Sequence, residues 1–162
     1  MSKTVSIFVD VQNIYYTTRE VYGAHFDYNA FWAKVGHGRS IARAYAYAID
    51  RGDEKQRQFQ NILRAIGFTV KLKPYIQRSD GSTKGDWDVG IALDMLEQAG
   101  SSDVMVLASG DGDFDILVNR VRHRYKTPVE VYGVPALTAK TLMNEASCFI
   151  PVDEKLLIKK CR

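Results

Sequence analysis

The chain has 162 residues, of which 46% are hydrophobic and 25% charged, and its formal net charge is +3. This length suits one domain, and the composition excludes a mainly disordered, collagen-like or membrane-spanning chain. No apolar run approaches the ~20 residues that a bilayer span needs, and an acid interrupts the N-terminal apolar run before a signal peptide could develop. The two cysteines, Cys148 and Cys161, lack metal-site spacing. We therefore expect a cytoplasmic protein without disulfides or structural zinc.

Strand-like and helix-like segments alternate along the first half of the chain. The run Thr4–Asp10 is apolar and β-branched, which predicts a buried strand. Further strands are predicted at 41–49 and 68–76, and helices at 13–22, 28–35 and 53–66. Residues 78–85 are polar and contain glycine, which predicts a loop.

The second half continues the same alternation. It predicts helices at 86–98, 114–125 and 136–146, strands at 104–108, 128–132 and 149–152, and a tight turn at 109–113. Such alternation is typical of parallel βαβ units with right-handed crossovers. We expect one α/β domain over residues 1–152, followed by a basic C-terminal tail at 153–162.

Acidic residues are concentrated in three short motifs. Seven of the 19 acids lie there, and the other 12 face 22 lysines and arginines. In an open parallel sheet, ligands bind at the carboxyl ends of the strands. If the motifs converge at that edge, an acidic pocket lies in a basic surface, which suits a metal site that acts on a polyanion.

The first motif is FVDVQN at residues 8–13. Asp10 ends a predicted strand, and a helix follows at once, so this carboxylate is expected at the carboxyl edge of the sheet. The alternative is that Asp10 only caps the helix, because aspartate is a favoured N-cap.

The second motif, KGDWDVGIALD at residues 84–94, contains Asp86, Asp88 and Asp94. Asp86 can cap the predicted helix, and Asp88 lies in its first turn. Asp94 is six positions after Asp88, roughly 240° around the helix, so it reaches a shared site only from the side. A purely structural Asp94 is the alternative.

The third motif, SGDGDFD at residues 109–115, follows the most clearly buried predicted strand. Its acids Asp111, Asp113 and Asp115 stand at alternate positions, and like charges this close repel each other. A divalent cation is the simplest compensation. The sixth and twelfth positions are Ile116 and Arg122, which excludes an EF-hand, and oxygen ligands favour Mg²⁺ or Mn²⁺. A structural turn is the alternative.

Together the three motifs resemble those of NYN domains of the PIN-like nuclease superfamily, in the LabA-like branch. The resemblance implies a three-layer α/β/α sandwich with a central, mostly parallel sheet and a metal-dependent ribonuclease site. It implies that Asp10, Asp88 and Asp111 are the core acidic residues, with Asp113 close by and Asn13 supporting Asp10. Val11-Gln12 stands where many relatives have a glycine-containing sequence.

These motifs lead us to expect a Mg²⁺- or Mn²⁺-dependent ribonuclease. Asp10, Asp88, Asp111 and Asp113 would be the metal-binding and catalytic residues. Supporting roles are assigned to Asn13, Ser109, Asp94 and Asp115, and contacts to single-stranded RNA to Lys71, Lys73, Arg78 and Lys84. Lys84, which lies in the polar loop, could equally be a solvated side chain.

Two other functions compete with this interpretation. A binding or regulatory module could keep the acidic pocket with little or no turnover. A small-molecule phosphatase also places acids after parallel strands, but its Asp-x-Asp signature is absent because the first strand ends in Asp10-Val11-Gln12. Nucleotide-binding glycine loops, a GxSxG elbow and an HExxH pair are also absent from the sequence.

Overall fold

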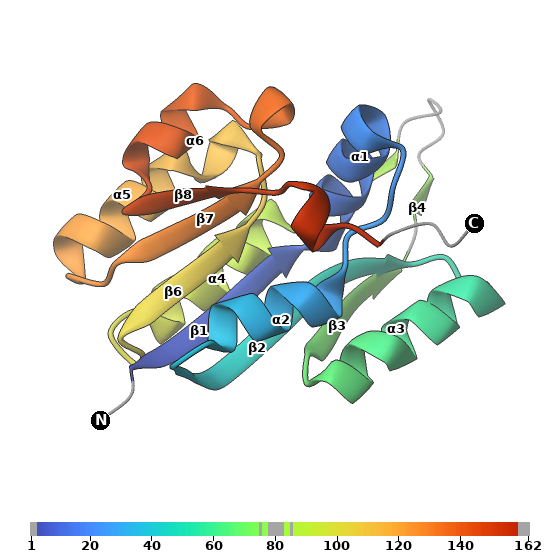
Figure 1. The fold of residues 1–162 in the computed structure, drawn as a ribbon, viewed down its shortest axis with the longest axis horizontal. Coiled ribbons are helices and arrows are strands. Elements are labelled where there is room, and N and C mark those ends of the chain that lie inside the picture. Colours follow the sequence, from blue (N-terminus) through green and yellow to red (C-terminus); the bar gives the residue numbers. More distant parts are fainter. Residues whose placement is uncertain (1–2, 75, 78–82, 85, 159–162) are drawn as a thin grey trace.

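A central sheet of six parallel strands organises the molecule, as the computed structural model shows (Figure 1). The structure describes residues 3–74, 76–77, 83–84 and 86–158. The strand order is β3-β2-β1-β6-β7-β8. The strands are β1 (Thr4–Asp10), β2 (Ser40–Asp50), β3 (Thr69–Pro74), β6 (Val104–Ala108), β7 (Val129–Gly133) and β8 (Cys148–Pro151). All neighbouring pairs run parallel, so the predicted parallel sheet is confirmed.

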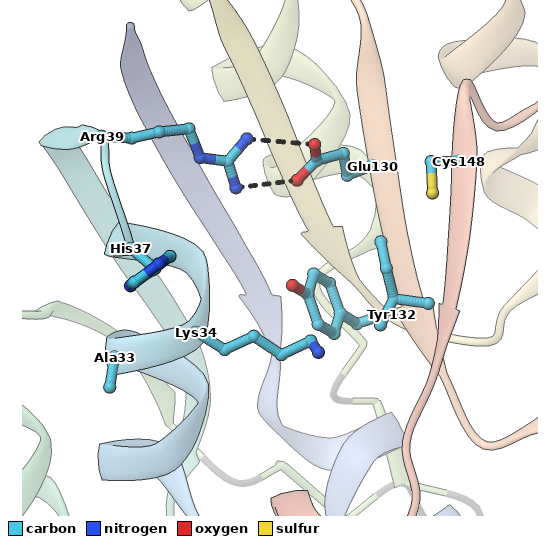
Figure 2. A pocket seen from close by; sticks show the side chains of 8 residues that line it. Ala33, Lys34, His37, Arg39, Glu130, Tyr132 and Cys148 are labelled. Carbon is cyan, nitrogen blue, oxygen red and sulfur yellow. Dashed lines mark hydrogen bonds and ion pairs between the residues drawn. The ribbon is translucent and has the colours of Figure 1, made fainter. Parts of the chain in front are cut away.

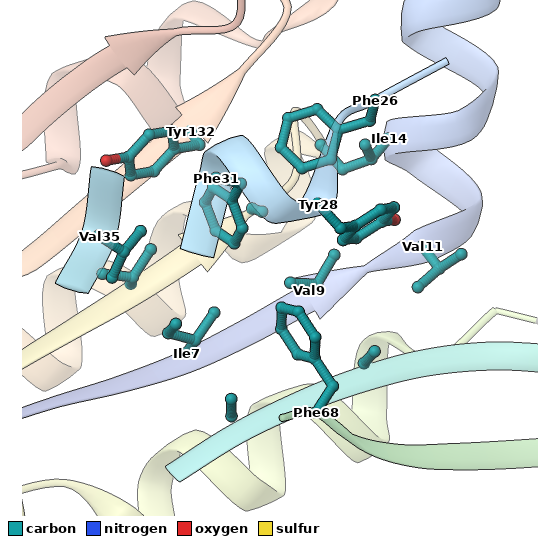
Figure 3. Packing of buried hydrophobic residues seen from close by; sticks show 14 of the residues in the cluster. Ile7, Val9, Val11, Ile14, Phe26, Tyr28, Phe31, Val35, Phe68 and Tyr132 are labelled. Atoms are coloured by element: carbon teal, nitrogen blue, oxygen red, sulfur yellow. The ribbon is translucent and has the colours of Figure 1, made fainter. Parts of the chain in front are cut away.

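Helices cover both faces of this sheet. The helices α1 (Val11–Tyr22), α2 (Tyr28–Gly36) and α3 (Glu54–Ile66) contribute to one apolar core, and α4 (Asp88–Gln98), α5 (Asp115–Arg124) and α6 (Lys140–Glu145) to the other. Alternate residues of β1 enter opposite cores, Ile7 and Val9 the first and Phe8 the second. Figure 3 shows Phe31 of α2 among the side chains of the first core. The predicted three-layer α/β/α sandwich is therefore confirmed.

Local sequence explains where the elements begin and end. Asp27 accepts a hydrogen bond from the Ala30 backbone N–H at 3.0 Å and so caps α2. Asp53 caps α3 in the same way. The strand β1 has fully buried residues from Val5 to Val9 because it lies in the middle of a sheet covered on both sides.

Some predicted boundaries differ from those of the structure. The helix predicted at 136–146 is divided into the 3₁₀ helix η2 (Pro135–Leu137) and α6. The break occurs because the Ala139 backbone N–H donates to the Gly110 carbonyl at 3.1 Å, which folds the chain over the turn after β6. A second 3₁₀ helix, η1 (Gly112–Phe114), precedes α5.

The predicted loop and the predicted tail also contain structure. The segment predicted as a loop includes β5 (Thr83–Lys84), which pairs antiparallel with β4 (Ile76–Gln77). The tail forms the 3₁₀ helix η3 (Glu154–Leu156), and Leu156 and Leu157 are buried in the first core. Residues 153–158 therefore pack on the domain.

The chain changes direction in the sheet next to β1. It builds β2 and β3 on one side of β1 and then crosses to β6 on the other. In open parallel sheets, such a reversal leaves a crevice at the carboxyl ends of the two central strands. This place, between β1 and β6, is the switch point of the sheet. Asp10 ends β1 at this point, and the third acidic motif follows β6. Among the described helices, none has the length and apolar character needed to cross a bilayer.

Candidate metal centre

Two neighbouring strands place the first residues of the site side by side. Val9 of β1 is paired with Ala108 of β6, so Asp10 and Ser109 come next on adjacent strands. The Ser109 hydroxyl donates to Asp10 Oδ2 at 3.1 Å, and Asp10 is only 7% exposed. This hydrogen bond and the burial restrict the carboxylate to one orientation.

Asn13 joins the beginning of α1 to the turn after β6. Its backbone N–H donates to Asp10 Oδ1 at 3.4 Å, and its side-chain Oδ1 accepts the Gly110 backbone N–H at 2.8 Å. The predicted cap and the predicted site role of Asp10 are thus compatible, because the same carboxylate caps α1 and faces the switch point. Only the backbone of Asn13 therefore reaches Asp10, whereas its side chain holds the turn after β6.

The turn after β6 orients the next acids. Asp111 Oδ1 accepts the Asp113 backbone N–H at 2.9 Å, which starts η1, and the Asp111 backbone N–H donates to Ser109 Oγ at 3.2 Å. A Cβ at position 110 would lie 2.8 Å from the Leu137 carbonyl oxygen. Glycine is needed there because the η2 segment passes directly over the turn.

The first turn of α4 brings Asp88 to the same place. Trp87 fixes this turn, because its indole Nε1–H donates to the Ala48 carbonyl of β2 at 2.8 Å. Gly90 leaves room for the indole, since a Cβ there would meet the Trp87 ring at 2.6 Å. Asp86 Oδ1 accepts the Asp88 backbone N–H at 3.2 Å.

These elements bring three carboxylates together. Asp88, Asp111 and Asp113 each offer an oxygen, and the three oxygens lie within 4.8 Å of one another. Asp88 and Asp111 are half-buried, and Asp113 is exposed. We call these three residues the acidic cluster. Asp10 borders it, since Asp10 contacts Ser109, which also accepts the Asp111 N–H.

Burial and mutual repulsion change the proton affinity of two of these acids. Desolvation, a hydrogen bond with the Asp111 carboxyl and the charges of Asp111, Asp86 and Asp10 raise the pKa of Asp88 to about 7. Burial raises the pKa of Asp10 to about 6, although the Asn13 N–H and the Ser109 hydroxyl partly oppose this rise. Neutral pH therefore leaves Asp88 partly protonated in the metal-free site.

The donor set fits a hard divalent cation. All the converging ligand atoms are carboxylate oxygens, which Mg²⁺ and Mn²⁺ prefer. The two ion pairs found among the described residues, Arg39–Glu130 and Lys71–Asp94, involve none of the acidic cluster. The negative charge of the acidic cluster is therefore not compensated by either of these ion pairs. A bound divalent cation would compensate it.

Asp94 of α4 has other partners. Its Oδ2 accepts a hydrogen bond from the Tyr47 hydroxyl at 2.8 Å and lies 2.6 Å from Lys71 Nζ. Lys71 also stands over the Tyr45 ring, 4.9 Å from its centroid. Both residues thus take part in a local ion pair on the β2–β3 side of α4, which matches the structural alternative considered for Asp94.

The remaining predicted residues lie at the beginnings of α4 and α5 or outside the described residues. Lys73 Nζ lies 4.5 Å from the centre of the Trp87 ring and donates to the Asp86 carbonyl at 3.2 Å, so it stands beside the start of α4. Asp115 begins α5 and accepts the Ile116 N–H at 2.6 Å. Arg78 and the side chain of Lys84 lie outside the described residues.

A hollow of about 600 Å³ opens elsewhere, between α2 and the strands β7 and β8. Figure 2 shows Arg39 and Glu130 facing each other there, and their ion pair is bidentate, with both distances 3.0 Å. Each charge neutralises the other, and none of the predicted acids lines this hollow. The acidic cluster is therefore the candidate site.

Asp86 and Trp87 of the second motif contribute to the site in ways that the sequence did not indicate. The charge of Asp86 raises the pKa of both Asp10 and Asp88, and Trp87 anchors the helix turn that carries Asp88. The sequence pattern indicates only a helix cap at Asp86. Its position two residues before Asp88, after a glycine, was the available signal.

A parallel α/β/α sandwich with acids converging at its switch point is consistent with a PIN-like fold. Within this class the chain belongs to the NYN domain family, whose model matches residues 4–153. It is 27% identical to the low amplitude and bright protein LabA of Synechococcus elongatus, over 93% of this chain and 84% of that protein.

Solved structures agree with this fold. A protein of unknown function from Vibrio parahaemolyticus is 54% identical, superposes with a TM-score of 0.92 and covers 97% of each chain. A carbohydrate kinase from Agrobacterium tumefaciens has a TM-score of 0.52 at 12% identity, over 91% of this chain and 60% of the kinase. The second similarity reflects only the shared arrangement of strands and helices.

Proposed function

We propose that this protein is a metal-dependent ribonuclease that hydrolyses RNA phosphodiester bonds with Mg²⁺ or Mn²⁺. The observation that carries the proposal is the convergence of Asp88, Asp111 and Asp113 beside the buried Asp10 at the switch point of the sheet. The membership in the generally nuclease-like NYN family supports the same chemistry.

The acidic cluster would hold the ion, with Asp10 as a further ligand directly or through water. A bound divalent ion lowers the pKa of a coordinated water and stabilises the charge that develops on the phosphate. Ser109 and Asn13 keep the Asp10 carboxylate and the Asp111 turn in place by their hydrogen bonds. A carboxylate of the cluster would orient the attacking water and accept its proton.

The substrate must overcome the repulsion of the acids. A polyanion gains affinity from the ion and from basic side chains around the pocket. Lys73 stands beside the start of α4 and suits this role. Arg78 and Lys84 remain candidates from the sequence alone. We propose single-stranded RNA as the substrate.

The test is a cleavage assay on a fluorescently labelled RNA with Mn²⁺, Mg²⁺ or EDTA. We expect cleavage with either ion, none with EDTA, and a loss of at least about 100-fold in Asp111→Asn, a loss of the size caused by removing one preorganised electrostatic group. Asp94→Asn is the matched control and should cleave normally, since Asp94 is bound to Lys71 and Tyr47.

Cleavage that survives EDTA, or that is equal in Asp111→Asn and the wild type, would overturn the proposal. RNA binding without cleavage would instead identify a catalytically inactive RNA-binding or regulatory module.

A further inference from the structure

We propose that the exposed face of α1 binds single-stranded RNA by stacking an unpaired base on the ring of Tyr16. This inference rests on the proposed ribonuclease function and assigns it a second contact region beside the acidic cluster. We define the α1 face by the side chains of Gln12, Tyr15, Tyr16 and Arg19.

Aromatic side chains on this face are left in solvent. Tyr16 is 61% exposed and Tyr15 is 48% exposed, whereas the helix packs on the core through Val11, Ile14, Thr17 and Thr18. Neither Tyr15 nor Tyr16 belongs to the two apolar cores. Their rings therefore need another explanation than the stability of the core.

The α1 face lies on the helix whose first turn borders the acidic site. At 100° per residue its four side chains fall within an arc of about 100°, on the side away from Ile14 and Thr18. Asp10 caps the same helix, and Tyr16 is six residues further, about 9 Å along the axis. Figure 1 shows α1 rising directly from the carboxyl end of β1. A strand held at the acidic cluster thus reaches Tyr16 within a few nucleotides.

The two tyrosines differ in their availability. The Tyr15 ring is stacked with His25, with centroids 5.9 Å apart and 23° between the planes. Arg19 Nη1 also donates to the Tyr15 hydroxyl at 3.3 Å. For Tyr16, no ring or cation partner is found among the described residues. The ring of Tyr16 is therefore open to a ligand, and Tyr15 holds the Arg19 guanidinium on the adjoining surface.

This combination matches unpaired RNA better than other polyanions. Base stacking on exposed aromatic rings is the usual mode of single-strand recognition, because every base has an accessible π-face only when it is unpaired. Arg19 supplies a cation for the backbone phosphates next to the stacked base. Duplex RNA would offer the phosphates without the base.

The proposal is tested by the affinity of a fluorescein-labelled 12-nucleotide RNA, measured by fluorescence anisotropy in Mg²⁺. All proteins carry Asp111→Asn, so that binding is measured without cleavage. We expect Tyr16→Ala to weaken binding about 5- to 140-fold, from the stacking free energy of one base. Tyr16→Trp should retain the affinity. Arg19→Ala should reduce the log–log salt slope by about one unit.

Tyr125 provides the matched control. It is 41% exposed and follows α5 at the amino end of β7, away from the acidic cluster, so Tyr125→Ala should bind like the parent protein. A 2-aminopurine in the RNA should be quenched by the parent protein and much less by Tyr16→Ala. A blunt duplex should bind equally to the parent and to Tyr16→Ala.

Unchanged single-strand affinity in Tyr16→Ala, or an equal loss for the duplex, would overturn this inference. Cleavage of RNA by the otherwise native Tyr16→Ala protein at the wild-type rate and KM would do the same and leave the ribonuclease proposal standing. Quenching at Tyr16 in a protein that never cleaves RNA would instead support the stacking site and contradict the proposed activity.

Discussion

Helix α4 carries two aspartates with opposite surroundings. Asp94 faces β2 and β3, where Lys71 and the hydroxyl of Tyr47 satisfy its charge. Asp88, in the first turn of the same helix, lies among other carboxyls and has its pKa raised to about 7. One carboxylate therefore has its counter-ion within the fold, whereas no ion pair of the other is found among the described residues.

The difference shows which acids stabilise the fold and which oppose it. Glu130 resembles Asp94, because Arg39 binds it in a bidentate pair. The acidic cluster is held together by backbone hydrogen bonds and by the sheet, against its own repulsion. Unfavourable electrostatic interactions of this kind are concentrated at functional sites of proteins. A carboxylate without a basic partner is therefore a better indication of function than the presence of a carboxylate alone.

The largest expected effect that separates the two ends of α4 is the response to metal. Mn²⁺ at about 100 times its dissociation constant should add about 2.7 kcal/mol to the free energy of unfolding. In a domain of this size that raises the Tm by about 5–10 °C. Differential scanning fluorimetry should show this rise in the wild type and in Asp94→Asn.

The same measurement on Asp111→Asn should show most of the rise lost and a higher metal-free Tm. A full response to Mn²⁺ in Asp111→Asn would place the ion elsewhere and remove the distinction between the two ends of the helix.

The next effect is a pH dependence of the metal-free protein. Asp10 and Asp88 have folded-state pKa values of about 6 and about 7, above the unfolded value near 4. The folded state thus binds more protons, and the stability from these groups, complete below pH 4, is lost as the pH rises to about 7–8. For the buried Asp10 the loss is about 2–3 kcal/mol.

Urea denaturation in EDTA at pH 5 and pH 8 measures this loss. Asp88→Asn should lose less stability over this range than the wild type, and Asp94→Asn should behave like the wild type. Identical pH profiles for Asp88→Asn and the wild type would show that Asp88 is not destabilised by its neighbours.

A third effect concerns Asp94 of α4, which is paired with Lys71 and Tyr47. Asp94→Ala should lower the free energy of unfolding by about 1–3 kcal/mol, because it leaves the buried Tyr47 hydroxyl without its acceptor. The Mn²⁺ response should persist. In urea denaturation, Asp94→Ala combined with Tyr47→Phe should lose less than the sum of the single losses, since both remove one interaction. Additive losses would contradict the coupling.

The smallest effect concerns Trp87, whose indole fixes the turn at the beginning of α4. Trp87→Phe removes the indole N–H that donates to the Ala48 carbonyl, so it should destabilise the protein by about 1 kcal/mol. Because this bond fixes the turn that carries Asp88, Mn²⁺ affinity measured by isothermal titration calorimetry should fall several-fold. Unchanged affinity would mean that Asp88 is positioned without Trp87.

Much of this architecture was predictable from local patterns. The buried run ending at Asp10, the alternating strands and helices, and the acids after the strand at 104–108 all indicated a parallel α/β fold with a site at the carboxyl edge. The break in the helix predicted at 136–146 was not predictable, because it depends on the contact between Ala139 and Gly110, which lie 29 residues apart.

Sequence alone determined the order of the elements and the three acidic motifs, because strand and helix periodicity and capping depend on neighbouring residues. Tertiary structure decided which acids meet. Asp94 finds Tyr47 and Lys71 at separations of 47 and 23 residues, while Asp88 meets Asp111 across the switch point. The same packing decided that Tyr16 stays exposed on α1. A carboxylate has the same local signature in either case, and only the side chains that the fold brings against it determine whether its charge is neutralised.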